Sequence, residues 1–247
     1  DNKIPKDLTA EEILIRSGNI GSVRIGQKIG IEKFKLFLTK INVINEIKFD
    51  IEEVGIPIPF KWGKCKLATT SFGHGITTTP LQLAKGYAII TNGGFDIDPT
   101  IIKNKKEKMI KYKKRLIKKD VSEKINPILR KIVTSKEGTA SLANISGYEV
   151  AGKTGTAEKI ISGNYSPNKK INTFVSIFPI SKPKYVLVVI LDEPKMNKEY
   201  IYNYRDGSGF KLKGTPRNTS GWTSVEVAGH IIEKIGPILA TKYLEIN

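Results

Sequence analysis

The sequence has very few of the residues that build disulfides, zinc sites or membrane-spanning helices. Its 247 residues include one cysteine, Cys65, and two histidines, His74 and His230. One cysteine cannot form an intrachain disulfide, and these three residues do not have the spacing of a zinc site. The longest apolar run, residues 185–191, is too short to span a bilayer. The sequence therefore predicts no metal and no cofactor, and it predicts Cys65 to be a small buried residue.

Negative charge is scarce as well. Lysine and arginine number 41 against 24 aspartates and glutamates, which gives a formal net charge of +17. Such an excess is common in proteins that bind nucleic acids. However, the densest basic run, residues 103–119, lacks a regular series of aromatic residues on which bases could stack, and it is expected to form a solvated loop or hairpin. Lysine, isoleucine and asparagine are frequent throughout, so we attribute the charge to a compositional bias and predict no nucleic-acid partner.

Helix start signals organise the first half of the chain. Thr9 with Glu12, and Thr79 with Gln82, have the spacing of capping boxes. Residues 42–66 contain glycines and prolines that break regular structure. Apolar periodicity predicts helices in the remaining segments. Their approximate ranges are 10–16, 20–29, 32–40, 80–91 and 121–136.

The pattern changes to strands in the second half. Three runs rich in β-branched and aromatic residues, 148–156, 173–180 and 185–191, are separated by turn residues and predict strands. Residues 195–220 are rich in Gly, Asn, Tyr and Lys and are expected to be mobile. A long amphipathic helix is predicted over 224–243. Three antiparallel strands followed by a helix indicate an α/β fold rather than a parallel βαβ protein.

Two short motifs, 136 residues apart, carry the chemistry. Ser17-Gly18-Asn19 lies at the break between two predicted helices, and Lys153-Thr154-Gly155-Thr156 ends the first predicted strand. Acyl transfer from a peptide needs a proton carrier between the nucleophile and the leaving amine, which Ser17 can supply. The Asn19 amide can bond the substrate backbone. Lys153 provides positive charge and, if it packs near a second lysine, an amine of lowered pKa.

The rest of the lysine motif is suited to holding a substrate. Gly155 has no side chain, so an acyl donor can lie antiparallel along the strand edge. The hydroxyls of Thr154 and Thr156 can bind a substrate carboxylate, and the Thr156 amide can form half of an oxyanion hole.

Both motifs match the second and third signatures of the serine acyltransferases that include penicillin-binding proteins and β-lactamases. Other strings in the chain resemble the class B penicillin-binding proteins, and Ser71-Phe72-Gly73-His74-Gly75 resembles their division-specific, FtsI-type branch. The resemblance covers nearly the whole chain and is weakest over 101–120 and 195–218. The further matching strings are Thr79-Pro80-Leu81-Gln82-Leu83-Ala84, Asn92-Gly93-Gly94, Val150-Ala151-Gly152, Leu191-Asp192-Glu193-Pro194 and Ser220-Gly221-Trp222.

The resemblance implies a septal peptidoglycan D,D-transpeptidase. The implied fold is α/β, a β-lactamase/transpeptidase-like antiparallel sheet sandwiched by helices. The implied partners are peptidoglycan stem peptides, β-lactam antibiotics and membrane proteins of the divisome. The implied location is the periplasmic side of the inner membrane, on an N-terminal anchor absent from this chain. The residues that match the family's catalytic positions are Ser17, Asn19, Lys153 and Thr156, and those that match its binding positions for substrate or β-lactam are Thr154, Gly155 and Thr156.

One element of the family pattern is missing. The family's nucleophile lies in Ser-x-x-Lys, several dozen residues before Ser-x-Asn, and only 16 residues precede Ser17. The three Ser-x-x-Lys strings of this chain begin at Ser166, Ser181 and Ser208. They all follow Lys153 and none opens an apolar helix, so we predict that they are not catalytic. Residues 1–247 are therefore expected to be the C-terminal portion of one transpeptidase domain, without two N-terminal strands and the nucleophile helix.

Two other classes of function remain open. A β-lactamase shares the signatures, but one class of these enzymes deacylates with Glu-x-x-Leu-Asn between the second and third motifs. Residues 20–148 contain no such pattern. A transpeptidase-like scaffold that has lost its serine would be a non-catalytic binding module. The start at Asp1 favours truncation over such a loss, and the gene sequence upstream would decide between them.

Overall fold

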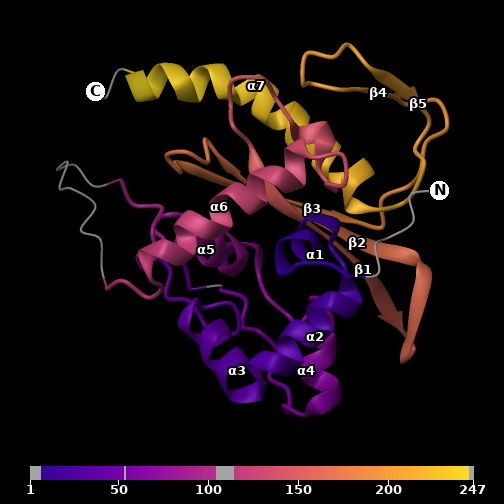
Figure 1. Cartoon of the computed structure of the whole chain (residues 1–247). Helices are drawn as coiled ribbons and strands as arrows, with labels where there is room; N and C mark the ends of the chain where they lie inside the picture. Colours follow the sequence, from indigo (N-terminus) through magenta and orange to yellow (C-terminus); the bar gives the residue numbers. More distant parts are fainter. Residues whose placement is uncertain (1–6, 53, 104–113, 245–247) are drawn as a thin grey trace. The chain divides into compact units, whose positions relative to one another are not determined.

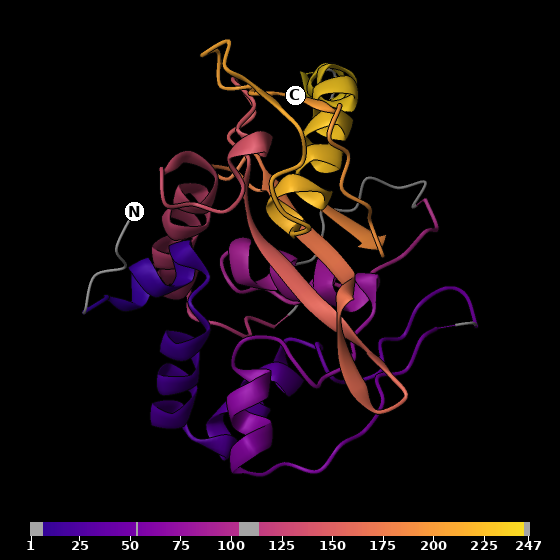
Figure 2. The same ribbon diagram turned by 90° about the vertical axis from the view of Figure 1, so that its right-hand side faces the viewer.

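The computed structural model describes residues 7–52, 54–103 and 114–244. The chain falls into two compact units, Asp1–Ile128 and Leu129–Asn247, which we call the helical unit and the sheet unit. Figures 1 and 2 show the elements of both from two directions, with the helical unit in indigo to magenta and the strands of the sheet unit in orange. Within the described ranges no helix is both long and apolar enough to cross a membrane.

The helical unit begins as the capping signals predict. Thr9 and Thr79 each accept a hydrogen bond from the amide of the N3 residue, whose side chain bonds back to the cap, so both predicted capping boxes are confirmed. Helix α4 was not predicted, because it is short and Gly63 at its N-cap provides no side-chain bond. The helices of this unit are α1 Ala10–Arg16, α2 Asn19–Ile29, α3 Ile31–Lys40, α4 Lys64–Thr70 and α5 Pro80–Thr91.

Close packing fixes α2 against α4. A Cβ at Gly26 of α2 would overlap the hydroxyl of Ser71, so only glycine lets the two helices approach this closely. Leu67 and Thr70 take the buried face of α4. Cys65 lies on the other face and is exposed, so the prediction of a buried cysteine was wrong.

A small apolar core joins the irregular segments of the helical unit to α5. Ile41, Ile89 and Ile117 are buried and pack with partly buried neighbours. The segment around the basic run, for which the sequence leaves a loop or a hairpin open, contains an antiparallel bridge between Phe95 and Arg115. The middle of that run, 104–113, lies outside the described residues. Helix α6, Lys119–Thr134, follows and crosses the division between the units.

The sheet unit contains the predicted antiparallel strands in the order β1-β2-β3. Their bounds are Ala151–Ile161, Asn164–Phe178 and Tyr185–Asp192. Helix α7, Ser224–Leu244, packs on β2 and β3. Arg130 of α6 donates hydrogen bonds to the carbonyl of Val150 at 2.6 Å and to Asn144 at 2.9 Å, which joins the end of α6 to the start of β1. The predicted α/β fold with an antiparallel sheet and flanking helices is confirmed.

Strands β1 and β2 are longer than predicted and continue beyond β3 as a hairpin, which Figure 2 shows from the side. Their pairing is irregular at one point, where Glu158 faces Lys170 but the next residue, Lys159, faces Ser166. Pro167 lies in the extra residues of β2. Because proline has no N–H for the ladder, it is confined to such irregular positions. The lysine- and proline-rich sequence there concealed the strand.

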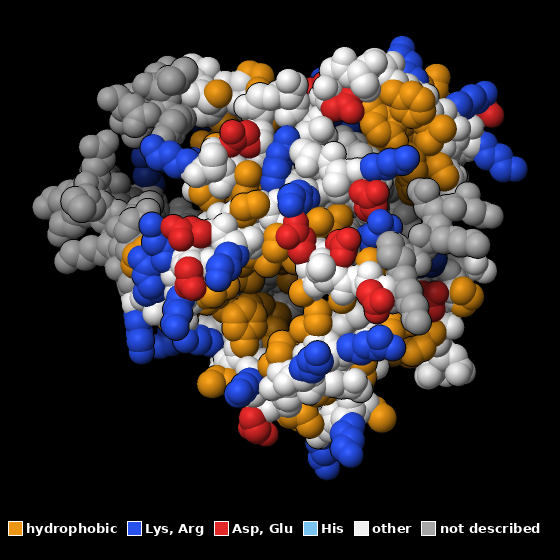
Figure 3. Space-filling model, viewed as in Figure 1, with side chains coloured by type: hydrophobic (Ala, Val, Ile, Leu, Met, Phe, Trp, Pro, Cys, Tyr) orange, Lys and Arg blue, Asp and Glu red, His pale blue; other side chains and the backbone are white. Residues whose placement is uncertain are grey.

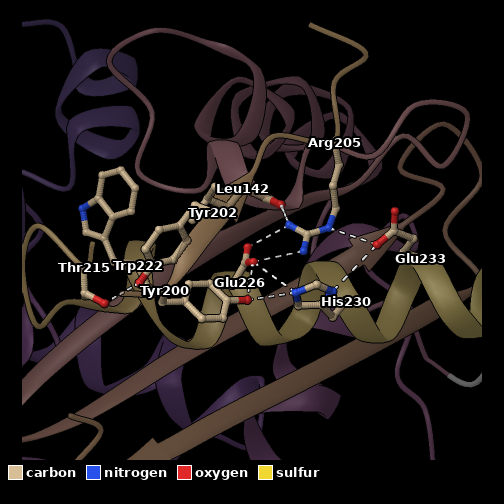
Figure 4. Close-up of polar contacts among 9 residues, drawn as sticks. All are labelled: Leu142, Tyr200, Tyr202, Arg205, Thr215, Trp222, Glu226, His230 and Glu233. Carbon is tan, nitrogen blue, oxygen red and sulfur yellow. Dashed lines mark hydrogen bonds and ion pairs between the residues drawn. The ribbon is translucent and has the colours of Figure 1, made fainter. Parts of the chain in front are cut away.

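The segment over 195–220 is tied to α7, although the sequence predicts a mobile segment. It contains a two-stranded ladder, β4 Ile201–Asn203 with β5 Lys211–Lys213. Arg205 donates hydrogen bonds of 2.8 Å to Glu226 of α7 and to the carbonyl of Leu142. Figure 4 shows this cluster, in which the Arg205 and Glu226 side chains are only 4% and 6% exposed. A buried ion pair with a partner on α7 leaves no local signal in the sequence.

Candidate active site

The lysine motif lies on β1, which pairs only with β2 among the described strands. The edge of β1 that faces away from β2 therefore has no neighbouring strand among the described residues. Across the ladder Lys153 faces Val175, Gly155 faces Thr173, and Thr156 faces Asn172. Because side chains alternate along a strand, Lys153 points to the opposite face of the sheet from Thr154 and Thr156.

Lys153 has an environment suited to proton transfer. Its ammonium group donates a hydrogen bond of 3.0 Å to the carbonyl of Thr154. Burial lowers the pKa of Lys153 from 10.5 to about 8, because a charged amine loses hydration there. A second lysine nearby was one way in which this pKa could be lowered, whereas burial is the cause in the structure. A lysine with a pKa of about 8 can release and take up a proton near neutral pH.

Gly155 leaves the edge of β1 open. It is exposed, and a Cβ at this position would touch only Thr173, at an ordinary contact distance of 3.9 Å. The chain itself therefore does not require glycine here. Gly152 of the same strand differs, because a Cβ there would overlap the carbonyl of Val175. The open position at Gly155 suits a ligand that lies along the strand.

Both threonine hydroxyls of the motif are held by residues from outside the sheet. The hydroxyl oxygens of Thr154 and Thr139 are 2.7 Å apart. The amide of Ser220 donates a hydrogen bond of 3.0 Å to the hydroxyl of Thr156. A hydroxyl has one donor and two acceptor sites, so each threonine can still bond a ligand.

Neither of these two supports was predicted from the sequence. Ser220 belongs to a string that resembles the family, which could have marked it. Thr139 lies in the link between α6 and the short 3-10 helix η1, Ser141–Ala143, and no motif marks it.

The serine motif forms the junction between α1 and α2 in the helical unit. Ser17 ends α1 in the left-handed conformation, with φ 56° and ψ 45°. Gly18 is the N-cap of α2, and Asn19 is the first residue of that helix. The predicted break between the helices is thus confirmed, and Ser17 and Asn19 are exposed at it. A non-glycine residue with positive φ is strained, and such strain is concentrated at functional sites.

The structure therefore places Lys153, Thr154, Gly155 and Thr156 side by side on β1, and it places Ser17 and Asn19 in the helical unit.

None of the Ser-x-x-Lys strings begins a helix. Ser166 lies within β2, and Ser181 follows β2 and bonds Glu149 through its hydroxyl. The hydroxyl of Ser208 accepts a hydrogen bond of 3.2 Å from the amide of Phe210 in the loop between β4 and β5. That the three serines are not nucleophiles stays a prediction.

Comparison of the sequence with protein families finds one described as "Penicillin binding protein transpeptidase domain", which matches residues 1–207. Probable peptidoglycan D,D-transpeptidase FtsI of Caulobacter vibrioides is 29% identical over 243 residues, which are 95% of this chain and 39% of that protein. Stage V sporulation protein D of Bacillus subtilis is 33% identical over 196 residues, which are 74% of this chain and 30% of that protein. The chain spans less than half the length of these curated relatives.

Solved structures show the same fold. The apo transpeptidase domain of Burkholderia pseudomallei penicillin-binding protein 3 aligns with a TM-score of 0.73 at 24% identity, covering 92% of this chain and 65% of that one. Penicillin-binding protein 3 of Mycobacterium tuberculosis in complex with aztreonam aligns with a TM-score of 0.74 at 24% identity, covering 92% of this chain and 52% of that one. These likenesses show the fold. This chain covers only part of each matched structure.

Proposed function

Because this chain belongs to the penicillin-binding protein transpeptidase domain family, we propose that it is part of a peptidoglycan D,D-transpeptidase that cross-links stem peptides through a serine acyl-enzyme. One observation carries the proposal. On an open sheet edge, four consecutive residues of β1 include a lysine with a pKa of about 8 and two threonines whose hydroxyls are already held in place. This combination offers a proton carrier and a binding strip for an extended acyl donor.

Each predicted residue has a role in this proposal. The acyl donor lies antiparallel along β1 beside Gly155, where no side chain obstructs it. The Thr156 amide stabilises the oxyanion that forms when the carbonyl is attacked. Lys153 and Ser17 carry the proton from the nucleophile to the leaving amine. Asn19 bonds the substrate backbone.

The same strip accounts for β-lactam binding. A stem peptide and a β-lactam each present a carboxylate, which the hydroxyls of Thr154 and Thr156 can bind. Penicillin-binding protein 3 of Mycobacterium tuberculosis has been solved with aztreonam and with ampicillin. That relative supports the proposal that this protein also binds β-lactams.

We further propose that the protein acts in cell division. The string Ser71-Phe72-Gly73-His74-Gly75 and the FtsI relative of Caulobacter vibrioides support this branch, whereas the relative from Bacillus subtilis is a sporulation protein. In this proposal the partners are divisome membrane proteins, and the domain lies on the periplasmic side of the inner membrane behind an N-terminal anchor. The test is to express the full-length gene product in cells depleted of their own FtsI and to measure septation. Failure of the stably expressed protein to restore septation would count against the proposal.

We propose that both units belong to a single transpeptidase domain whose nucleophile helix lies outside residues 1–247. The helical unit has an apolar groove of about 300 Å³. A helix that opens with Ser-x-x-Lys would bury its apolar face there. The apolar side chains that line the groove include Ile13, Leu14, Ile25, Ile29, Phe34 and Ile128.

The basic charge does not suggest another partner. In Figure 3 the Lys and Arg side chains are spread over the visible face and lie among Asp and Glu side chains. A nucleic-acid site would be expected to gather them in one stripe. The face in view therefore has no such stripe, and we keep the compositional explanation of the net charge as a proposal.

Labelling with a fluorescent penicillin tests the proposal. Residues 1–247 alone are expected to form no covalent adduct, whereas the full-length gene product that contains them is expected to form one. Replacing Lys153 by Ala should abolish labelling without unfolding the protein. Thr156→Val should have a milder effect because the backbone amide remains, whereas loss of an oxyanion donor costs about 2.7–4 kcal/mol. Near-normal labelling of the Lys153 variant would show that the lysine motif is not part of the active site.

A further inference from the structure

Two turns outside the sheet converge on the lysine motif. One contains Thr139 and links α6 to η1. The other is the 3-10 helix η2, Ser220–Trp222, which precedes α7. They hold Thr154 and Thr156 respectively, and both lie within the sheet unit. The way in which these turns are themselves fixed indicates what they do.

The turn at Thr139 is anchored to the end of α6. The amide of Ala140 donates a hydrogen bond of 3.1 Å to the carbonyl of Ile132. Ala140 is fully buried, and a Cβ at Gly138 would overlap that same carbonyl. Thr139 therefore has little freedom to move away from Thr154.

The turn at Ser220 is anchored to the sheet and to α7. The Ser220 hydroxyl donates a hydrogen bond of 2.7 Å to the carbonyl of Thr173, which faces Gly155 across the ladder. It also lies 2.8 Å from the hydroxyl of Ser224 in the first turn of α7. Ser220 and Ser224 are both almost completely buried. The serine side chain thus bonds the strand opposite Gly155 while its amide bonds Thr156.

The two turns also touch each other. A Cβ at Gly221 would lie 2.6 Å from the carbonyl of Thr139, so glycine allows the contact. On the other side, the Tyr202 hydroxyl donates a hydrogen bond of 2.9 Å to the carbonyl of Trp222, as Figure 4 shows. Strand β4 therefore braces η2, and the buried pair of Arg205 and Glu226 ties the segment after β4 to α7.

We propose that Thr139 and Ser220 are positioning residues that fix the hydroxyls of Thr154 and Thr156 as a pair of donors for one substrate carboxylate. This inference rests on the proposed function. The Thr156 oxygen accepts from the Ser220 amide, so its own hydrogen is directed elsewhere, and no acceptor for it is found among the described residues. When the Thr139 hydroxyl donates to Thr154, the hydrogen of the Thr154 hydroxyl is likewise directed away from Thr139. Hydroxyls held before binding lose less side-chain entropy when a ligand arrives.

The first test compares two ligands that differ only in the carboxylate, benzylpenicillin and its methyl ester, on the full-length gene product. Thr139→Val keeps the shape of the side chain but removes its hydroxyl. It should lower the second-order acylation rate constant for benzylpenicillin about tenfold, which corresponds to one hydrogen bond to a charged group, and change that for the ester about twofold at most. Thr139→Ser is the matched control and should restore the preference for benzylpenicillin. An equal loss for both ligands would indicate a merely structural role and overturn the proposal.

The second test needs no enzyme activity. In residues 1–247, NMR three-bond couplings to the threonine methyl groups report the side-chain rotamers. Thr154 and Thr156 should each occupy one rotamer. Thr139→Val should cause averaging at Thr154 alone, and Ser224→Ala, which removes one of the two partners of the Ser220 hydroxyl, should cause averaging at Thr156. Unchanged couplings in both variants would overturn the inference. Absence of acylation in the unmodified full-length protein would instead overturn the proposed function, and the couplings would still decide the inference.

Discussion

The two motifs of the candidate site are shaped by contacts of very different range. At the serine motif, the amide of Gly18 bonds the carbonyl of Ile13 at 2.9 Å, and the hydroxyl of Ser22 bonds the carbonyl of Gly18 at 2.9 Å. At the lysine motif, the partner of Thr154 is 15 residues away and that of Thr156 is 64 residues away. The first turn can form from its own sequence, whereas the second arrangement exists only after distant segments have packed on the sheet.

The largest effect is expected where a distant contact supports the sheet unit. Glu226→Ala removes the buried charge partner of Arg205, leaving only the exposed Glu233, and removes the carboxylate that accepts from the Tyr200 hydroxyl. Breaking a buried ion pair in this way costs about 3–5 kcal/mol of unfolding free energy, which urea denaturation measures. Hydrogen exchange should accelerate at the amides of residues 154–156 but not at those of residues 20–22.

The matched control for this variant is Glu233→Ala, which removes the other carboxylate near Arg205 from a side chain that is 55% exposed. Its cost should be below about 1 kcal/mol, as for an exposed pair. Equal losses in the two variants would contradict the view that burial, and not the number of charge pairs, decides how strongly this segment is held.

A pH dependence is expected from Lys153 in the same unit. Its pKa is about 8 in the folded chain against an ordinary 10.5, so between these pH values the unfolded chain binds more protons. The unfolding free energy should therefore rise from pH 8 to 10.5, by on the order of 2–3 kcal/mol relative to Lys153→Met. It should be flat in this comparison at lower pH, where the amine is charged in both states. Parallel pH profiles for the two proteins would show that the folded chain does not bury the amine.

Two glycines of β1 provide a smaller test within one strand. Gly152→Ala should lower the unfolding free energy by about 1–3 kcal/mol, because its methyl group would overlap the backbone of Val175. Gly155→Ala should change it by no more than about 0.5 kcal/mol, as at an exposed position, yet slow acylation of the full-length protein by penicillin. Thermal melts and labelling rates measure the two effects. Normal labelling of a stable Gly155→Ala variant would show that no ligand lies along this edge.

The smallest effect is expected at the serine motif. Ser17→Gly removes the strain of a positive φ and should stabilise the chain by about 0.5 kcal/mol, since glycine is favoured at this helix end, while lowering acylation in the full-length protein. Ser162→Gly is the matched control, because Ser162 has a φ of 51° in the turn between β1 and β2. It should gain similar stability and keep its acylation rate. If acylation falls in both variants, or in neither, the result would contradict the prediction that Ser17 itself acts in catalysis.

Signals in the sequence located most of the helices and strands but not their full extent. The capping boxes at Thr9 and Thr79 are local patterns, and they appear in the structure as predicted. Helix α4 has no such cap, and the extension of β2 runs through Pro167, so neither could be read from periodicity. The ladder of β4 and β5 depends on contacts with α7 and with η2, which no window of neighbouring residues reveals.

The candidate site divides along the same line. Residue types and their order mark Ser17, Asn19, Lys153 and Thr156, because the chemistry of acyl transfer restricts which side chains can serve. They do not mark Thr139, whose hydroxyl contact with Thr154 is formed by folding.

Motifs and periodicities within short stretches of the chain were enough to identify the family, the break between α1 and α2, and the strand that carries the lysine motif. Folding was needed to bury Lys153, which brings its pKa to about 8, and to bring Thr139 and Ser220 to the neighbouring hydroxyls. Loss of hydration and hydrogen bonds between distant segments depend on which groups meet in space. A position in the chain does not specify them until the sheet, η2 and α7 have packed together.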